Sequence, residues 1–336
     1  MSQSVPAPVS ASVPTPTPDP AATPDPTPVD QRLVVAVDIG GTKIAAGLVD
    51  SRGTLVASCE RPTPTAADAA TVLRTVGETV TDLRRHRAWA QVVGLGVCSA
   101  GPVDVKNGLV SPVNIPAWRD FPVIDRLTGH PALAGLPCAF VGDAVAMAAA
   151  EHRFGAARGH RDALCLVVST GIGAGLILDG QVRYGITGNA GHLGHISVDY
   201  AGEPCPCGSH GCLERLSSGT AIARHATRLG WTPPPGTAAT ASSAAVDARL
   251  GHPAALQAFD LAAQALASGI AAVAALVEIE VAVLGGGVMQ AADLLLPRLR
   301  HHLRGYLALP FTQRLRIRTA ELGTSAGLIG AASLLM

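Results

Sequence analysis

Aromatic residues make up only 3% of this 336-residue chain, and charged residues only 15%. Lys and Arg together number 25, as do Asp and Glu, so the formal net charge is zero. A chain without excess positive charge lacks the attraction to polyanions on which general nucleic-acid or anionic-lipid binding depends. The 48% of apolar residues still suffices for a large core, built from Ala, Val, Leu and Gly instead of rings. The length predicts roughly two domains.

The first 30 residues contain no Lys or Arg and no apolar run, which excludes the usual pattern of a targeting sequence. They hold nine of the 25 prolines, among Ala, Thr, Ser and Asp, so we predict a disordered tail over residues 1–31. A partner-binding arm is the alternative interpretation. Residues 261–277 carry no charge but are Ala-rich and shorter than the ~20 residues of a membrane span. We therefore expect a buried helix there and a soluble, cytoplasmic protein.

Seven cysteines, an odd number, argue against a disulfide framework. Four lie apart from one another, and three crowd into Cys205, Cys207 and Cys212. With His195 they read His-x9-Cys-x-Cys-x4-Cys, a donor set that completes a closed tetrahedral zinc site without an open position for catalytic water. We predict a structural zinc ion, with free thiols as the alternative.

Apolar runs and glycine-rich turns alternate along the chain. Strands are predicted at residues 33–39, 44–49, 92–97, 164–168, 176–178 and 281–284, and helices at 67–87, 144–154, 221–229, 253–277 and 291–307. Strands alternating with helices indicate an α/β protein. A strand–turn–strand pattern occurs twice, which predicts two similar lobes. Residues 231–241, rich in Pro, Gly and Thr, predict a surface loop.

Three glycine turns are candidate phosphate sites. In the first, Gly40 and Gly41 expose backbone amides, Thr42 adds a hydroxyl, Lys43 adds a charge, and Asp38 offers an oxygen ligand for Mg²⁺. The second runs from Ser169 to Gly175 and includes Thr170, Gly171 and Gly173; the third is Gly285-Gly286-Gly287. A strand, not a helix, follows the second turn, which disfavours a dinucleotide-binding fingerprint. The alternative is that all three are ordinary structural turns.

Gly142-Asp143 follows the apolar run 138–141, where a helix is predicted to begin. An Asp at such a place is often only an N-cap. The alternative is a carboxylate at a cleft edge that accepts the proton of an attacking hydroxyl.

Together these motifs resemble the ROK family of sugar kinases, within the hexokinase and actin-like ATPase superfamily, over about residues 32–336. The resemblance is carried by VDIGGTKIAAGLV (37–49), GPVD (101–104), NIPAW (114–118), GNAGHLGH (188–195), CPCGSHGCLE (205–214) and GTSAGLIGAA (323–332). It implies a two-lobed actin-like, ribonuclease H-like fold that binds ATP and a sugar between the lobes. The lobes would be residues 32–142, completed by a C-terminal helix at about 324–336, and residues 143–323.

The resemblance also implies roles for individual residues. Asp143 would deprotonate the sugar 6-hydroxyl, and Mg²⁺ would accompany ATP. Sugar contacts would come from Gly101, Asn114, Gly142, His192, His195 and Glu214. Homodimers are common in the family, so a homodimer is expected. His192 stands where many members have Glu, and bacterial N-acetylmannosamine kinases have His at that position. Gly142 stands where Asn is common. Both differences make glucose less secure as the substrate.

Three functions therefore compete. The first is an ATP-dependent 6-kinase for a hexose or N-acetylhexosamine, such as glucose or N-acetylmannosamine; a sugar-like cyclitol is an alternative acceptor. The second is a transcriptional regulator of the same family. The roughly 32 residues before the first strand carry almost no basic residues for a DNA-reading helix, so we expect no nucleic-acid partner. The third is a catalytically weak sugar-binding protein, which Gly142 favours and intact Asp38 and Asp143 disfavour.

Overall fold

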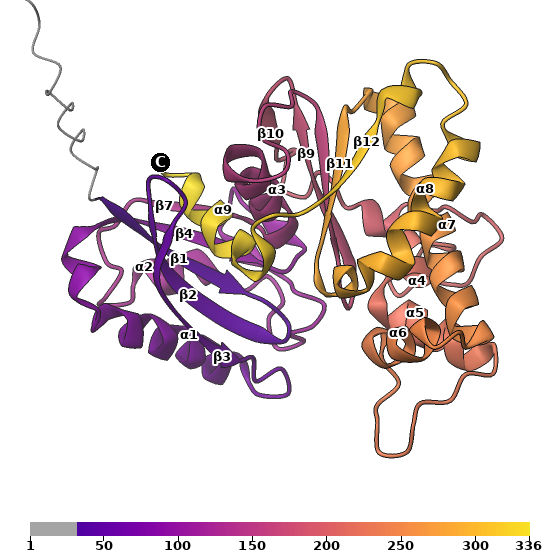
Figure 1. Ribbon diagram of the computed structural model, residues 1–336. Coiled ribbons are helices and arrows are strands. Elements are labelled where there is room, and N and C mark those ends of the chain that lie inside the picture. The colour runs from indigo at the N-terminus through magenta and orange to yellow at the C-terminus, as the bar shows by residue number, and fades with distance from the viewer. Residues whose placement is uncertain (1–31) are drawn as a thin grey trace, which may run out of the picture. The chain divides into compact units, whose positions relative to one another are not determined.

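Two five-stranded sheets form the framework of residues 32–336, the part of the chain that the computed structural model describes (Figure 1). The first sheet has the order β3-β2-β1-β4-β7 and the second β10-β9-β8-β11-β12. The strands of the first sheet are β1 (Leu33–Ile39), β2 (Lys43–Asp50), β3 (Leu55–Pro62), β4 (Val92–Ser99) and β7 (Cys138–Gly142). Those of the second are β8 (Ala163–Val168), β9 (Ile172–Leu178), β10 (Gln181–Arg183), β11 (Val281–Gly285) and β12 (Arg316–Thr319).

Both sheets repeat one pattern of strand directions. In each, three strands form an antiparallel meander whose first strand (β1 or β8) pairs in parallel with a fourth strand (β4 or β11), which in turn pairs in parallel with a fifth (β7 or β12). The predicted α/β class and the duplicated strand–turn–strand unit are therefore confirmed. A small ribbon pairs β5 (Val103–Asp104) with β6 (Leu109–Val110). The predicted boundary between the lobes, after residue 142, falls where β7 ends and α3 (Asp143–Phe154) begins. The division into two lobes itself stays a prediction.

The helices of residues 32–336 include five that lie near their predicted positions, the C-terminal helix that the resemblance implied, and three that were not predicted. They are α1 (Ala69–Arg84), α2 (Val123–Thr128), α3 (Asp143–Phe154), α4 (Leu213–Ser217), α5 (Gly219–Arg228), α6 (Ala241–Arg249), α7 (Pro253–Val277), α8 (Ala292–Tyr306) and α9 (Ala326–Ser333). Short 3₁₀ turns occupy Arg87–Gln91, Leu193–His195, Gly287–Ala291, Thr312–Arg314 and Gly323–Ser325. Helix α1 ends three residues before the predicted residue 87 because the backbone becomes extended at His86, before the first 3₁₀ turn begins.

Helices α3 and α9 pack on each other within a core that also includes residues of both sheets. Helix α3 follows the first sheet but contacts β8 and β9, whereas α9 follows the second sheet but contacts β1 and β4. Small residues make this close packing feasible: a Cβ at Gly330 would overlap the backbone of Ala146, and a Cβ at Gly96 would overlap that of Ala331. A core of this kind explains how the chain folds with so few aromatic residues.

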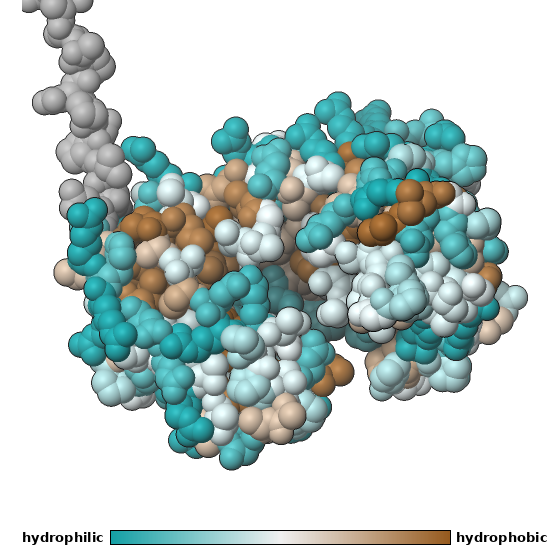
Figure 2. All heavy atoms as spheres, turned by 60° about the horizontal axis from the view of Figure 1, so that its bottom comes forward, coloured by the Kyte–Doolittle hydropathy of each residue, from teal (hydrophilic) through white to brown (hydrophobic). Residues whose placement is uncertain are grey.

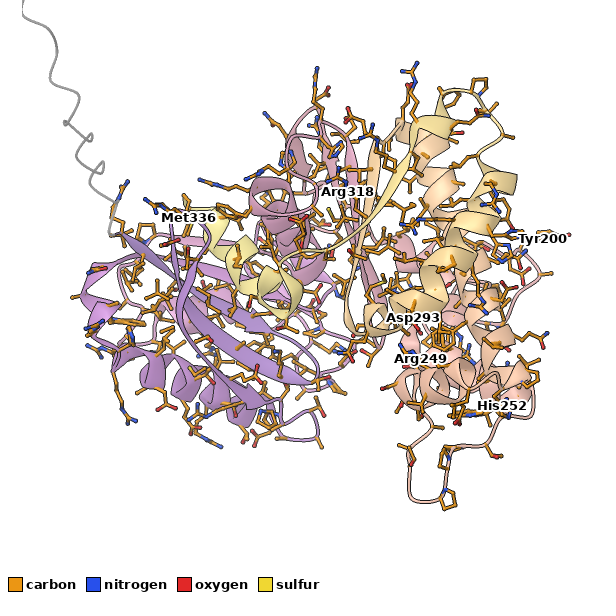
Figure 3. The ribbon with its side chains drawn as sticks, viewed as in Figure 1. Tyr200, Arg249, His252, Asp293, Arg318 and Met336 are labelled. Atoms are coloured by element: carbon orange, nitrogen blue, oxygen red, sulfur yellow. The ribbon has the colours of Figure 1, made fainter. Side chains whose placement is uncertain are left out.

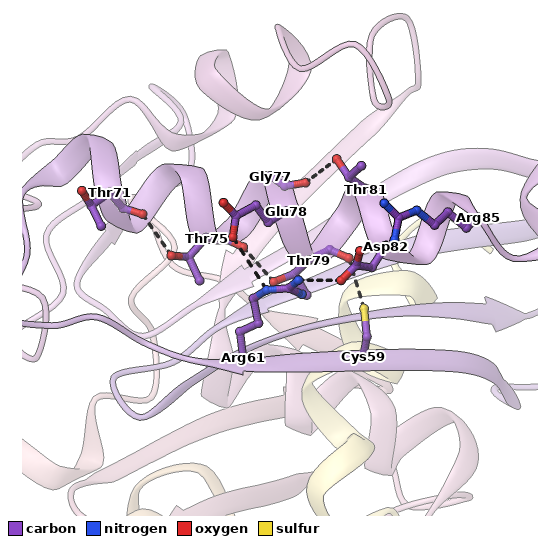
Figure 4. A network of polar contacts seen from close by, with 10 residues as sticks. All are labelled: Cys59, Arg61, Thr71, Thr75, Gly77, Glu78, Thr79, Thr81, Asp82 and Arg85. Carbon is purple, nitrogen blue, oxygen red and sulfur yellow. Dashed lines mark hydrogen bonds and ion pairs between the residues drawn. The ribbon is translucent and has the colours of Figure 1, made fainter.

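The outer faces of the sheets are covered separately. Helices α1 and α2 cover the first sheet, and α5 to α8 cover the second. Edge strand β3 is tied to α1 by polar contacts (Figure 4): Arg61 pairs with Asp82 (2.6 Å) and Glu78 (3.8 Å), and the Cys59 thiol donates to the Thr79 carbonyl (3.1 Å). The alternating exposure of β3 fits a strand with one face against this helix.

Helix α7 corrects one step of the membrane argument. The sequence-based expectation rested only on the uncharged residues 261–277, which are too few to span a membrane. The helix itself has 25 residues and is long and apolar enough to cross a membrane by length and composition. Half of its most apolar window is buried inside the protein, and side chains such as Phe259 and Leu266 are fully buried. The predicted buried helix is thus confirmed.

Residue Trp231 departs from the expected surface loop. Its ring is fully buried in the core around α5 to α8, and its indole N–H donates to Asp247 of α6 (2.7 Å). This partner lies in α6, a helix that was not predicted from the sequence. Residues 232–240 do form a connection without helix or strand.

Apolar side chains also reach the surface. Figure 2 shows a brown apolar area at the upper left of the face it presents, while teal and white atoms cover most of the rest. Among the described residues, Ile186 (99%) and Tyr200 (97%) are the most exposed large apolar side chains. The predicted tail, residues 1–31, lies outside the described part.

Candidate functional site

The carboxyl ends of β1, β4 and β7 bring together the acidic residues predicted for catalysis. Asp38 is in register with Cys98 of β4, which is in register with Val141 of β7, one residue before Gly142 and two before Asp143. Parallel strands place their carboxyl ends at one edge, where α/β proteins bind ligands. Asp38 lies close enough to Asp143 for its negative charge to raise the pKa of Asp143.

Asp143 is the first residue of α3, and Gly142 is its N-cap. The side chain therefore does not cap the helix in the usual way; its Oδ1 accepts from the adjacent Ala144 N–H (2.7 Å). Burial, followed by the nearby negative charge of Asp38, raises the pKa of Asp143 to about 7. Burial also raises the pKa of Asp38, while a Cys98 hydrogen bond and Lys43 lower it. A general base is most effective when its pKa lies near the working pH.

The first glycine turn, residues 40–42, joins β1 to β2 as predicted. The Gly40 N–H donates to the Lys43 carbonyl, and the Thr63 hydroxyl donates to the Gly40 carbonyl (2.7 Å). The Lys43 ammonium pairs with Glu60 of β3 (2.7 Å), a partner that the sequence did not suggest. A Cβ at Gly41 would overlap the side chain of Asn114, so this turn directly adjoins a predicted sugar loop.

The predicted sugar loop, residues 114–118, is held in place by its own apolar side chains. Ile115 and Trp118 are fully buried, and Trp118 stacks on Phe121 with ring centroids 4.4 Å apart. The Arg119 guanidinium donates to three backbone carbonyls of the same loop. Asn114 remains exposed beside Gly41.

The second glycine turn is shorter than predicted. It covers Ser169 to Gly171, and β9 already begins at Ile172. Gly173 lies within β9, where a Cβ would crowd Ala144 of α3, so its lack of a side chain serves helix packing. Gly285 likewise lies in β11 against Met147 and Ala320. A phosphate role for the glycines of both turns stays a prediction; Gly171 and Gly286 also approach neighbouring atoms closely, at Glu214 and the Val168 backbone.

Near this turn lies a cavity of 760 Å³, a volume typical of sites for small molecules and cofactors. Its wall includes Ser169, Thr170, Gly219, Thr220, Ala223, Arg224, Thr227, Arg228, Ala239, Thr240, Ala241, Ser242, Ala245, Val246, Arg249, Gly287, Val288, Gln290 and Ala291. The cavity thus joins the second and third glycine turns. Most of the wall comes from α5 and α6, which no sequence motif marked.

The arginines of this wall have acidic partners. Arg249 and Asp293 lie together in Figure 3, with contacts of 2.8 and 2.7 Å. Arg224 and Arg228 both pair with Glu203, next to the cysteine cluster. The cavity consequently has polar groups at its rim without a large unpaired positive charge among the described residues.

The residues predicted to contact the sugar form a second group. The His192 ring lies 3.6 Å from the position that a Cβ would take at Gly101, and 6.2 Å from the ring of His195 between centroids. Glu214, at the start of α4, accepts from the backbone N–H of Ile172 (2.8 Å). Gly142 faces open space: its nearest neighbour is the Gly188 carbonyl, 4.0 Å from an added Cβ.

The residues His195, Cys205, Cys207 and Cys212 converge as predicted. Their ligand atoms lie within 4.8 Å of one another. The Sγ atoms of Cys207 and Cys212 are 3.6 Å apart, and His195 Nδ1 is 3.8 Å from the Cys205 Sγ. A tetrahedral zinc ion with Zn–S bonds of about 2.3 Å separates two sulfurs by about 3.8 Å, so the cluster fits this metal.

The chain is similar to known proteins in both sequence and structure. A family model, "ROK family", matches residues 34–336. A glucokinase of Streptomyces coelicolor is 33% identical over 320 residues, covering 90% of this chain and 97% of that protein. An N-acetylmannosamine kinase of Yersinia pseudotuberculosis is 34% identical over 301 residues, covering 89% and 96%. A ROK family glucokinase from Streptomyces griseus, crystallised with glucose and AMPPNP, superposes with a TM-score of 0.78 at 34% identity, covering 90% and 98%.

Proposed function

Because the chain belongs to the ROK family, we propose that it is an ATP-dependent kinase that phosphorylates the 6-hydroxyl of a hexose or N-acetylhexosamine. The observation that carries this proposal is the position of Asp143, at the carboxyl end of β7, with a pKa raised to about 7. A carboxylate with this pKa is ionised in a large fraction of molecules near neutrality and still binds a proton well.

In the proposed reaction Asp143 accepts the proton of the 6-hydroxyl as its oxygen attacks the γ-phosphorus of ATP. A bond forms between the sugar oxygen and phosphorus, the bond from phosphorus to the bridging oxygen breaks, and ADP leaves. We expect the amides of Gly41 and Gly171 and the hydroxyl of Thr42 to bind phosphate oxygens, whereas the Gly40 N–H is already donated to the Lys43 carbonyl and closes the turn. The 760 Å³ cavity supplies the space for the nucleoside.

Two metal ions are part of the proposal. Asp38 and Asp143 repel each other in a buried setting, so a hard divalent cation near Asp38 suits the site. When bound with ATP, Mg²⁺ neutralises charge on the phosphates. The four-residue cluster would hold zinc as a structural ion that orders the loop before Glu214.

Two residues bear on the choice of sugar. Gly142 leaves open space beside Asp143, where the family commonly has the amide of an Asn, so one contact near the 6-hydroxyl is missing. His192 presents an imidazole, held at Nδ1 by the Asn189 carbonyl (3.0 Å), where many members have a carboxylate. The imidazole supports including N-acetylhexosamines with glucose among the substrates. The expected homodimer stays a prediction.

The test is ADP release coupled to a reporter enzyme, with glucose, mannose, N-acetylmannosamine and N-acetylglucosamine as acceptors. We expect turnover with at least one of them. A Gly142→Asn variant should raise kcat/KM for the preferred sugar if the missing amide contact limits binding near the 6-hydroxyl. Tight binding of one sugar without turnover of any would replace the kinase with a sugar-binding protein.

A further inference from the structure

Asn189 bonds to the backbone of a residue 86 positions away in the chain. Its side-chain oxygen accepts from the Val103 N–H (3.0 Å), and its side-chain NH₂ group donates to the Val103 carbonyl (2.6 Å). The same NH₂ group donates its second hydrogen to the Thr187 hydroxyl (2.9 Å). One amide side chain thus satisfies both backbone polar groups of Val103, as a neighbouring β-strand would.

Further contacts join the same two segments. The Val105 N–H donates to the Thr187 carbonyl (3.0 Å). Gly188 is buried with φ = +97°, and a Cβ there would overlap Val105, so only glycine fits this close approach without strain. The Ala190 N–H donates to the Tyr184 carbonyl (3.0 Å), which closes residues 184–190 into a compact loop.

Each joined segment carries one predicted sugar contact. Gly101 lies two residues before Val103, and His192 lies three residues after Asn189. The Asn189 carbonyl also contacts His192 Nδ1 (3.0 Å), which orients the ring. The ring then faces Gly101, with ring atoms 3.6 Å from the position of an added Cβ. A continuous path of contacts runs from Val103 through Asn189 to His192.

We propose that Asn189 is a positioning residue for sugar recognition, which clamps the loop of His192 to the segment of Gly101 so that both meet the sugar in one fixed geometry. This inference rests on the proposed function only for its effect on the sugar. Because no side-chain hydrogen bond given for Asn189 reaches Asp143 or the glycine turns, we expect the clamp to act on sugar binding and to leave the phosphoryl donor unaffected.

The experiment compares Asn189→Ala, Asn189→Asp and wild type, with Asn107→Ala as a matched control. Asn107 lies in the turn that follows β5, and its side chain bonds only to Asp104 among the contacts described (2.6 Å). In the absence of sugar, amide hydrogen exchange at Val103 should be at least tenfold faster in Asn189→Ala than in wild type or the control. The Asp variant keeps an acceptor for the Val103 N–H but faces the Val103 carbonyl with an oxygen, so its exchange should be intermediate.

Kinetics then separate positioning from general damage. In Asn189→Ala we expect KM for the sugar to rise about 10- to 100-fold, with KM for ATP and kcat within about twofold of wild type. Unchanged exchange at Val103, or equal rises in both KM values, would overturn the clamp. If wild type phosphorylates no sugar, the proposed function fails, while the exchange result still decides whether the clamp exists. If Asn189→Ala does not fold, the Asp variant gives the same two readouts.

Discussion

The carboxylate of Glu214, at the start of α4, accepts a hydrogen bond from the backbone N–H of Ile172, where the second glycine turn enters β9 (2.8 Å). Glu214 directly follows the predicted zinc loop, since Cys212 lies two residues earlier. One oxygen therefore holds the turn proposed for phosphate binding, and the other is available for the predicted sugar contact. We infer that this residue links the predicted metal loop to the proposed donor and acceptor sites.

Replacement of Glu214 should consequently affect both substrates. In Glu214→Ala we expect KM for ATP and for the sugar each to rise about tenfold, about 1.4 kcal/mol, the scale of one hydrogen bond to a charged group. Glu214→Gln keeps an oxygen for the Ile172 N–H, so KM for ATP should stay near wild type while KM for the sugar rises. Steady-state kinetics with each substrate varied checks this, and Glu78→Ala on α1 is the control. An unchanged KM for ATP in the Ala variant would mean that the turn does not depend on Glu214.

The pH dependence of turnover should follow Asp143. Because burial and Asp38 raise its pKa to about 7, the fraction of ionised base, and with it kcat/KM, should rise as the pH passes from about 6 to about 8. Asp143→Asn should lower kcat by 10²- to 10⁴-fold, the usual contribution of a general base, and leave sugar affinity nearly intact. The measurement is the pH profile of kcat/KM together with sugar binding by calorimetry. A variant with near-normal kcat would remove Asp143 as the base.

The same group should influence folding stability. Asp143 binds a proton more tightly in the folded state than in the unfolded chain, where its ordinary value is 3.8. The folded state therefore loses stability relative to the unfolded state as the pH rises from about 4 to about 7. Asp143→Asn lacks this loss, so its Tm should exceed that of wild type at pH 8 and by less at pH 5. Thermal unfolding at the two pH values checks this, and a Tm difference that is larger at pH 5 would contradict it.

Much of the framework was predictable because the signal is local. The β1–β2 hairpin shows as two β-branched runs around Gly40-Gly41, and α7 shows as one long apolar stretch with Pro253 at its first position. Strand β3 was missed because its alternation of exposed and half-buried residues contains Glu60 and Arg61. Helix α6 has little apolar periodicity, and its partner Trp231 is buried through a contact that sequence reasoning does not reveal.

The candidate site divides in the same way. The four predicted metal-ligating residues lie within 18 positions, so their spacing alone predicted the cluster that the structure contains. The ion pair of Lys43 with Glu60, the packing of Gly173 against α3 and the bonds of Asn189 to Val103 join residues from separate elements. Such contacts depend on the tertiary arrangement, which no motif or period encodes.

A methyl group at Gly41 should disturb the site without harming the core. The Cβ of Gly41→Ala would overlap the side chain of Asn114, which must then move from its place beside the first glycine turn. We expect kcat/KM for the sugar to fall at least tenfold, with an unchanged unfolding temperature. The control is Gly305→Ala in α8, where no atom lies within 4 Å of the added Cβ and helix propensity predicts a gain of up to about 1 kcal/mol. If Gly41→Ala has the same kcat/KM for the sugar as wild type, Asn114 does not contact the sugar.

The three thiols of the predicted zinc site differ in burial, so their replacement should affect stability to different extents. Cys212 is fully buried and Cys205 is 7% exposed, whereas Cys207 is exposed. Purified protein should contain about one zinc per chain by elemental analysis. Cys212→Ser should lose the metal and lower the Tm strongly, since its site lies within packed structure; Cys207→Ser should lose the metal with a smaller Tm change. Cys138→Ser, on β7 and outside the cluster, is the control and should keep one zinc. Wild-type protein that is metal-free, fully folded and active would overturn the zinc proposal.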